Sequence, residues 1–141
     1  MFHLLYFFLG HALLAAGFYS THRWVLHGKL GLWPHFRSLY LQHRYHHKKP
    51  RDPGGFLFSP GWNAILFLAL ALLAFVIPAM GLGAISYVLL YSWRHRRSHE
   101  GASGPIADHH REHHFRNPQS NFDIVYPIID RLMGTKRKSQ S

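Results

Sequence analysis

The apolar and polar positions of this chain fall into long blocks. Residues 2–21 are almost continuously apolar, and residues 62–93 form a second apolar block. A helix of about 20 apolar residues, at roughly 1.5 Å per residue, crosses a bilayer core of about 30 Å. The second block is too long for one crossing, and three helix-breaking residues lie near its middle: Pro78, Gly81 and Gly83. It therefore predicts a helical hairpin with arms at about 61–77 and 82–99.

These blocks predict an all-α integral membrane protein with about three transmembrane helices, one N-terminal span and one helical hairpin. A cleaved signal peptide is the alternative for the first span. A charged N-terminal region is missing and the residues after 21 make a poor cleavage site, so we expect a retained helix. Each hairpin arm is short, so a partial, re-entrant hairpin also fits the pattern. The polar segments 28–60 and 100–141 are expected outside the bilayer, with short helices at 36–49 and from Pro127 to about Gly134.

Composition narrows the partners of such a protein. The 141 residues are enough for a single domain, residues 1–141, and carry a formal net charge of +10. This charge predicts acidic partners, such as anionic lipid headgroups or an acidic redox protein. A nucleic acid is not expected, because the basic residues crowd against the membrane spans and no nucleic-acid-binding signature accompanies them. The absence of cysteine excludes disulfides, thiolate metal sites and thiol catalysis.

Histidine is the unusual feature of the composition, with 14 copies. Two stretches share the spacing HxxHH, so on a helix all three imidazoles of each stretch leave one face. Two further pairs have looser spacings, HxxxxH and HxxxH. The ten histidines of these four clusters are His22, His27, His43, His46, His47, His95, His99, His110, His113 and His114.

The predicted topology brings all four clusters to one face of the membrane. The first span delivers its histidines to the side opposite the N-terminus, and the hairpin leaves from that side and returns to it. The polar tail with the last cluster stays there. Nearly all lysines and arginines lie on the same side, including Arg94, Arg96 and Arg97. By the positive-inside rule this is the cytoplasmic face.

Ten clustered histidines predict a metal site. Neutral imidazole binds Fe, Zn, Cu and Ni, and a tetrahedral ion needs about four ligands, so ten are enough for two ions with open positions. Carboxylates are too few for the Glu-rich di-iron sites of ferritin-like bundles. We expect the nearest ones, Glu100, Asp108 and Glu112, to accept the outer N–H of ligand imidazoles. Two alternatives remain: solvated basic segments that touch lipid headgroups or chelate metal adventitiously, or a non-catalytic membrane protein that binds a metal such as Zn.

The other four histidines are not expected to be ligands. His3 and His11 lie too far along the first helix, since His11 is about 16 Å from His22 at about 1.5 Å per residue. His109 points about 100° away from the neighbouring ligand on a helix, which predicts a position at the surface or behind the ligands. His35 lies near the first HxxHH stretch but outside its spacing.

The order of the spacings, HX4H, HX2HH, HX3H and HX2HH from His22 to His114, resembles the histidine boxes of the fatty acid hydroxylase/sterol desaturase superfamily. Within it, the order resembles that of the fatty acyl and sphingolipid 2-hydroxylases. The stretch from Asn121-Phe122 to Gly134-Thr135 is also similar to the C-terminal signature of the superfamily. The first box, with Arg23 and Gly28, additionally resembles the bacterial β-carotene hydroxylases.

The resemblance implies a membrane-bound non-haem dimetal oxygenase, di-iron when active, that inserts one oxygen atom of O2 into a C–H bond of a lipid from the bilayer. It implies that the ten histidines are the metal ligands and that electrons come from a cytochrome b5- or ferredoxin-like donor. Carotenoid hydroxylation or a desaturase-type oxidation is the alternative reaction. A purified sample can carry Zn in place of Fe, because imidazole binds both. The chain differs from the superfamily in its three expected crossings, where relatives commonly show four. It also lacks a fused cytochrome b5 domain, so we expect a separate donor protein.

Overall fold

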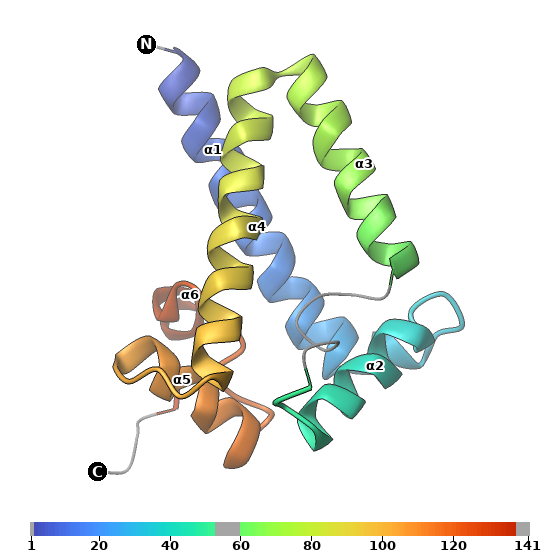
Figure 1. The fold of residues 1–141 in the computed structure, drawn as a ribbon, viewed down its shortest axis with the longest axis vertical. Helices are drawn as coiled ribbons and strands as arrows, with labels where there is room; N and C mark the ends of the chain where they lie inside the picture. Colours follow the sequence, from blue (N-terminus) through green and yellow to red (C-terminus); the bar gives the residue numbers. More distant parts are fainter. Residues whose placement is uncertain (1, 53–59, 138–141) are drawn as a thin grey trace.

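The computed structural model describes residues 2–52 and 60–137, and every regular element within these ranges is helical (Figure 1). The long helices are α1 (Phe2–Ser20), α3 (Pro60–Val76) and α4 (Pro78–His99). The shorter elements are η1 (Thr21–Leu26), η2 (Lys29–Leu32), α2 (Arg37–Lys48), α5 (Pro105–Phe115) and α6 (Pro127–Leu132). The all-α prediction is confirmed for the described residues. Parts of the two predicted polar segments, residues 53–59 and 138–141, lie outside the described ranges.

The predicted hairpin is present, but its turn is shorter than expected. Ile77 alone connects α3 to α4, and α4 begins at Pro78 and not at 82. Proline disfavours helical geometry in the residue before it, and Ile77 accordingly has φ −133° and ψ 81°. Proline is itself favoured at the first position of a helix, where its missing N–H has no partner to lose. The prediction that the turn extends to Gly81 is therefore wrong, since Gly81 lies inside α4.

The glycines of α1 and α4 instead allow the helices to approach closely. A Cβ atom added at Gly10 would overlap the carbonyl oxygen of Met80, and one added at Gly83 would overlap the carbonyl oxygen of Phe7. Gly81 packs in the same way against α3. Small residues at helix crossings are the usual means of close backbone packing in membrane proteins.

The hydrophobic core lies between α1 and α4. Its buried members are Ala15, Phe18, Leu70, Ala84, Tyr87, Val88 and Val125. The rings of Phe18 and Tyr87 meet edge to face, with centroids 5.4 Å apart. Val125, which precedes α6, is fully buried, so the C-terminal segment packs onto the α1–α4 pair. Among the described residues of α3, Leu70 is the one that is buried.

One helix in the described part of the chain is long and apolar enough to cross a bilayer, the 25-residue run Phe2–Leu26 formed by α1 and η1. The helix α3 is apolar but has 17 residues, short of the about 20 that a full crossing needs. The helix α4 has 22 residues and carries arginines in its last turn. By length and composition the described part of the chain thus contains one candidate span and one shorter apolar helix, α3.

The short helices gather at one end of the long ones (Figure 1). There α4 finishes and α1 passes into η1, whereas the N-terminus and the α3–α4 turn lie at the opposite end. Between α4 and α5 the chain reverses sharply at Gly101 (φ 91°) and Gly104 (φ 116°), a backbone conformation that glycine adopts at little cost. This end of the molecule contains all four histidine clusters.

Candidate metal centre

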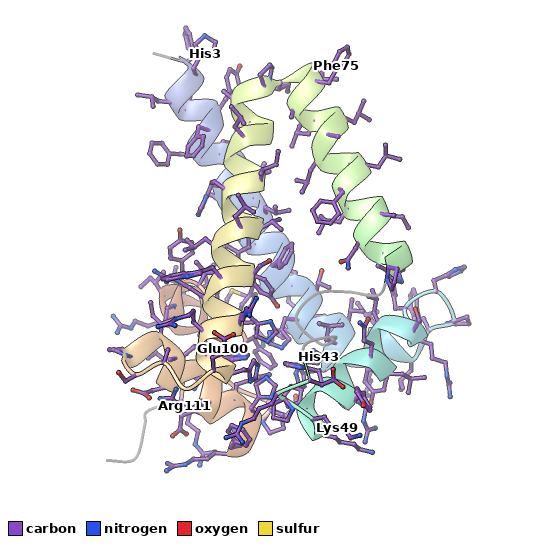
Figure 2. The ribbon with its side chains drawn as sticks, in the orientation of Figure 1. His3, His43, Lys49, Phe75, Glu100 and Arg111 are labelled. Carbon is purple, nitrogen blue, oxygen red and sulfur yellow. The ribbon has the colours of Figure 1, made fainter. Side chains whose placement is uncertain are left out.

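The four histidine clusters converge into two groups of five. Group one comprises His22, His27, His43, His47 and His113. Group two comprises His46, His95, His99, His110 and His114. Within each group the ligand nitrogens all lie within 4.8 Å of one another. Figure 2 shows His43 at this end of the molecule, with His3 and Phe75 at the other end.

Each HxxHH stretch divides its histidines between the two groups. On α2, His43 and His47 join group one, whereas His46 joins group two. On a helix with about 100° per residue, position i+4 lies about 40° to one side of position i, and position i+3 lies about 60° to the other side. On α5 the outer pair joins group two and the middle histidine, His113, joins group one. The two helices therefore face each other across the seam between the groups.

A local departure from α-helical geometry brings His22 and His27 together. In an α-helix, residues five apart lie about 140° apart around the axis. Residues Thr21–Leu26 instead form a π-helix, and the amide of His27 donates to the carbonyl of His22 at 3.1 Å. The wider turn brings the two ring centroids to 5.0 Å. The HX4H spacing thus belongs to a π-helical turn, which occurs frequently at functional sites and which the apolar pattern did not predict.

The ring nitrogens of group one point at one another. His43 Nε2 lies 3.1 Å from His22 Nε2, 2.7 Å from His27 Nε2 and 3.1 Å from His47 Nε2. A neutral imidazole has a single N–H, so these contacts cannot all be hydrogen bonds and some oppose two lone pairs. In addition, Nε2 of His113 is buried without a hydrogen-bond partner. A cation among these nitrogens would satisfy all five, so group one fits a metal ion.

Group two has the same character. His46 Nε2 lies 3.1 Å from His95 Nε2, and His110 Nε2 lies 3.0 Å from His99 Nε2. Both ring nitrogens of His114 are buried without a hydrogen-bond partner. Metal–nitrogen bonds of about 2.0–2.1 Å place ligand nitrogens up to about 4 Å apart, close to the spread within each group. Five imidazoles would leave an octahedral ion one open position.

Backbone carbonyls hold the outer nitrogens of two group-one rings. His22 Nδ1 donates to the carbonyl of Phe122 at 2.5 Å, and His113 Nδ1 donates to the carbonyl of Ser120 at 2.7 Å. These bonds fix the tautomer, because a proton on Nδ1 leaves the lone pair of Nε2 facing the other histidines.

The carboxylates expected in this role have other partners. They form ion pairs on their own helices: Glu100 with Arg96 at 2.7 Å, Asp108 with Arg111, and Glu112 with Arg116 at 3.1 Å. Pairs three or four residues apart are neighbours on a helix surface, so each arginine reaches its carboxylate more easily than a ligand ring does. The actual acceptors of the two group-one rings are the carbonyls of Phe122 and Ser120. The sequence did not predict them, because every residue has a backbone carbonyl.

Burial keeps the candidate ligands neutral. Together with the neighbouring histidines, it lowers the pKa of His46 and His47 from 6.5 to about 3, and that of His27 to about 2. The same causes hold the pKa of three further rings well below 6.5: His43, His110 and His113. Neutral imidazole is the form that binds a metal ion, so the site is in its metal-binding state at pH 7.

The four histidines not expected as ligands lie outside both groups. His3 and His35 are exposed, and His11 bonds to side chains of α4 and of the segment before α6. Of the two positions expected for His109, the one behind the ligands is correct. Its side chain is buried, and Nε2 donates to Asp130 at 2.9 Å.

A cleft of about 410 Å³ opens onto both groups. Its lining includes His27 and His47 of group one and His114 of group two. Arg44 and Lys48 of α2 line the same cleft, so the approach to the histidines is cationic. The rings of His47 and His114 stack with centroids 4.1 Å apart, and the two groups are therefore contiguous at this opening.

The sequence is similar to those of known proteins. A family model described as fatty acid hydroxylase matches residues 7–135, nearly the whole chain. The chain belongs to the fatty acid hydroxylase family. Two dihydroceramide fatty acyl 2-hydroxylases of Arabidopsis thaliana are 29% and 30% identical to it over 128 residues. The match covers 83% of this chain and 54% of each relative, so the chain spans about half the length of these curated relatives.

A similar fold is found among solved structures. One of them is full-length Scs7p, of which only the hydroxylase domain is visible. The match covers 99% of this chain and 58% of the Scs7p chain, with a TM-score of 0.75 and 21% identity. At this identity the likeness shows a shared fold. The predicted resemblance of the chain to the fatty acid hydroxylases is confirmed.

Proposed function

We propose that this protein is a membrane-bound lipid hydroxylase that oxidises a C–H bond of a fatty acyl chain. The observation that carries the proposal is the pair of five-histidine groups at one end of an apolar helical bundle, in a chain of the fatty acid hydroxylase family. One oxygen atom of O2 would become the hydroxyl group and the other would leave as water, with two electrons and two protons taken up. The fatty acyl substrate is argued from the relatives, which are named as fatty acyl 2-hydroxylases.

The surface of the long helices supports a membrane location. Large apolar side chains point outward from α1 and α3, with Phe2 70%, Leu5 62%, Leu68 73% and Phe75 85% exposed. Each Å² of such surface costs about 25 cal/mol in water, a cost that a bilayer removes. We assign one crossing to α1 and two to the arms of the α3–α4 hairpin, of which α3 is the shorter. A helix as short as α3 is accommodated by local thinning of the bilayer.

Charge supports a cytoplasmic metal centre. Lys49 and Arg111 lie at the same end as His43, opposite His3 and Phe75 (Figure 2). Basic residues accumulate on the cytoplasmic side of membrane proteins. This basic face would also dock an acidic electron donor of the cytochrome b5 or ferredoxin type, because complementary charge steers such encounters.

The two histidine groups would each hold one metal ion, iron in the active enzyme. Two iron ions would supply the oxidising chemistry that an unreactive methylene requires. The protein holds the ligands neutral and orients His22 and His113 through their Nδ1 hydrogen bonds. It also shields the inner ligands from bulk water, since His110 is 1% and His113 0% exposed.

Two clefts offer routes for an amphiphilic substrate. An apolar cleft of about 410 Å³ lies between α1, α2 and α3, and its lining includes Phe18, Leu39 and Leu66. An acyl chain from the bilayer suits such a lining. The polar cleft that opens onto both histidine groups, with Arg44 and Lys48, suits the headgroup.

Lipid analysis of an expressing host tests the proposal. The wild-type protein, co-expressed with a reductase and donor, should yield a hydroxylated acyl lipid that the empty host lacks, and His113→Ala should abolish it. His35→Ala is the matched control, because His35 is exposed and belongs to neither group, and it should retain the product. Product from His113→Ala would overturn the proposal. A different outcome would indicate a metal-storage protein: the His113→Ala variant loses metal, but the lipid profile is the same in the empty host, the wild-type strain and the variant strains.

A further inference from the structure

We propose that Asp130 is a positioning residue for one metal site only: it holds the backbone segment 120–123 that orients His22 and His113, and so sets the metal affinity of group one but not of group two. The inference rests on the metal-binding role proposed above for the histidines.

The carboxylate of Asp130 is fully buried, and both of its oxygens accept two hydrogen bonds. Its side chain is 0% exposed at the start of α6. Oδ1 accepts from the amide of Phe122 at 2.8 Å and from the Thr135 hydroxyl at 2.6 Å. Oδ2 accepts from the amide of Asp123 at 2.8 Å and from His109 Nε2 at 2.9 Å. A carboxylate has about four lone-pair sites, so these four donors use its whole capacity.

The amides that Asp130 binds belong to the segment whose carbonyls hold the histidines. Phe122 donates its N–H to Asp130 and accepts the Nδ1–H of His22 on its carbonyl. Two residues earlier, the carbonyl of Ser120 accepts the Nδ1–H of His113. A movement of this backbone would therefore rotate two group-one imidazoles together.

The segment needs such support because its backbone is strained. Asn121 lies between Ser120 and Phe122, whose carbonyls accept the two histidine N–H groups, and has φ 57°, in the left-handed region that non-glycine residues rarely adopt. Its amide donates to the carbonyl of Thr135 at 3.0 Å, and its Oδ1 accepts from the amide of Arg137 at 2.7 Å. Strained residues persist only where their surroundings over-determine them, and Asp130 fixes the residue that follows.

Neither His110 nor His114 of group two shows a comparable connection in the described part of the chain. Nδ1 of His110 and Nδ1 of His114 are buried without a hydrogen-bond partner. The competing explanation is that Asp130 simply braces α5 through His109. Because α5 carries ligands of both groups, bracing would weaken both groups equally when Asp130 is changed.

Two backgrounds separate these explanations. His110→Ala disables group two and leaves group one to be measured, and His43→Ala does the reverse. Asp130→Asn keeps the size of the side chain but turns an N–H₂ group toward amide donors. Co²⁺ affinity of the purified full chain in detergent should fall about 10- to 100-fold in the His110→Ala background, the usual effect of losing a group that orients a ligand. The absorption spectrum of the Co²⁺ ion should change as well, and neither should change in the His43→Ala background.

Tyr126→Phe is the matched control. It removes a partly buried hydrogen bond, which the Tyr126 hydroxyl donates to His11 Nε2 at 2.6 Å, just beyond the same segment. It should lower the unfolding temperature and leave both Co²⁺ affinities unchanged. Where Asp130→Asn does not fold, Thr135→Val removes one of the four hydrogen bonds, and its smaller loss should again be confined to group one.

Equal losses in the two backgrounds, or no loss in either from a folded variant, would overturn the positioning role. A wild-type chain that retains no metal would refute the proposed function first, and this inference with it. The two failures are therefore distinguishable in one set of samples.

Discussion

Adjacent histidines on α2 are expected to bind different ions. His46 belongs to group two and His47 to group one, although they are neighbours in the chain. His46→Ala and His47→Ala are therefore matched substitutions. Each removes one of the five imidazoles of its own group and leaves all five imidazoles of the other group in place.

The size of the effect follows from the number of ligands. Structural zinc sites with four ligands bind with about 10–16 kcal/mol, or about 2.5–4 kcal/mol per ligand. At about 1.4 kcal/mol for each factor of ten, one lost imidazole should weaken its own ion by about two to three orders of magnitude. The other ion should change much less, because all its ligands remain.

Metal content after dialysis against graded chelator concentrations measures this. Each single variant should lose one ion at low chelator and retain the other. Combining His46→Ala with His114→Ala, both in group two, should still leave one ion, whereas combining His46→Ala with His47→Ala should leave none. If the adjacent pair retains an ion, or the same-group pair loses both, the division of ligands between the groups is incorrect.

Three further predictions concern the fold and its setting. Gly83→Ala should cost about 1–3 kcal/mol, because the added methyl group would overlap the carbonyl of Phe7, while Gly17→Ala, with nothing within 4 Å, should not lower the unfolding temperature. Metal-free protein should lose stability as the pH falls below about 6.5, since unfolded histidines take up protons that the buried ones, with their lowered pKa, do not. Thermal unfolding should show a slope of up to about 1.4 kcal/mol per pH unit for each such histidine, and a flat profile would contradict it. In this cysteine-free chain, Lys49→Cys should react with an impermeant maleimide only from the cytoplasmic side and His3→Cys only from the other; labelling of both from one side would refute the proposed topology.

The sequence alone determined the features that depend on neighbours along the chain. The long apolar blocks predicted α1 and the α3–α4 hairpin, because a helix needs only local backbone hydrogen bonds and a continuous apolar surface. The HxxHH spacing predicted that three rings leave one face of α2 and of α5. The order of the spacings was also sufficient to indicate the family, which the comparisons confirm.

Only the tertiary structure decided which histidines share a group. The spacing on α2 predicts that His43, His46 and His47 lie on one face. It does not predict that this face is divided between two groups, because the division depends on α5 packing opposite α2. The π-helical turn at η1 and the carbonyls of Ser120 and Phe122 were equally invisible in the residue pattern. Periodicity is set by residues a few positions apart, whereas a backbone acceptor acquires its role only when a distant part of the chain presents a ring to it.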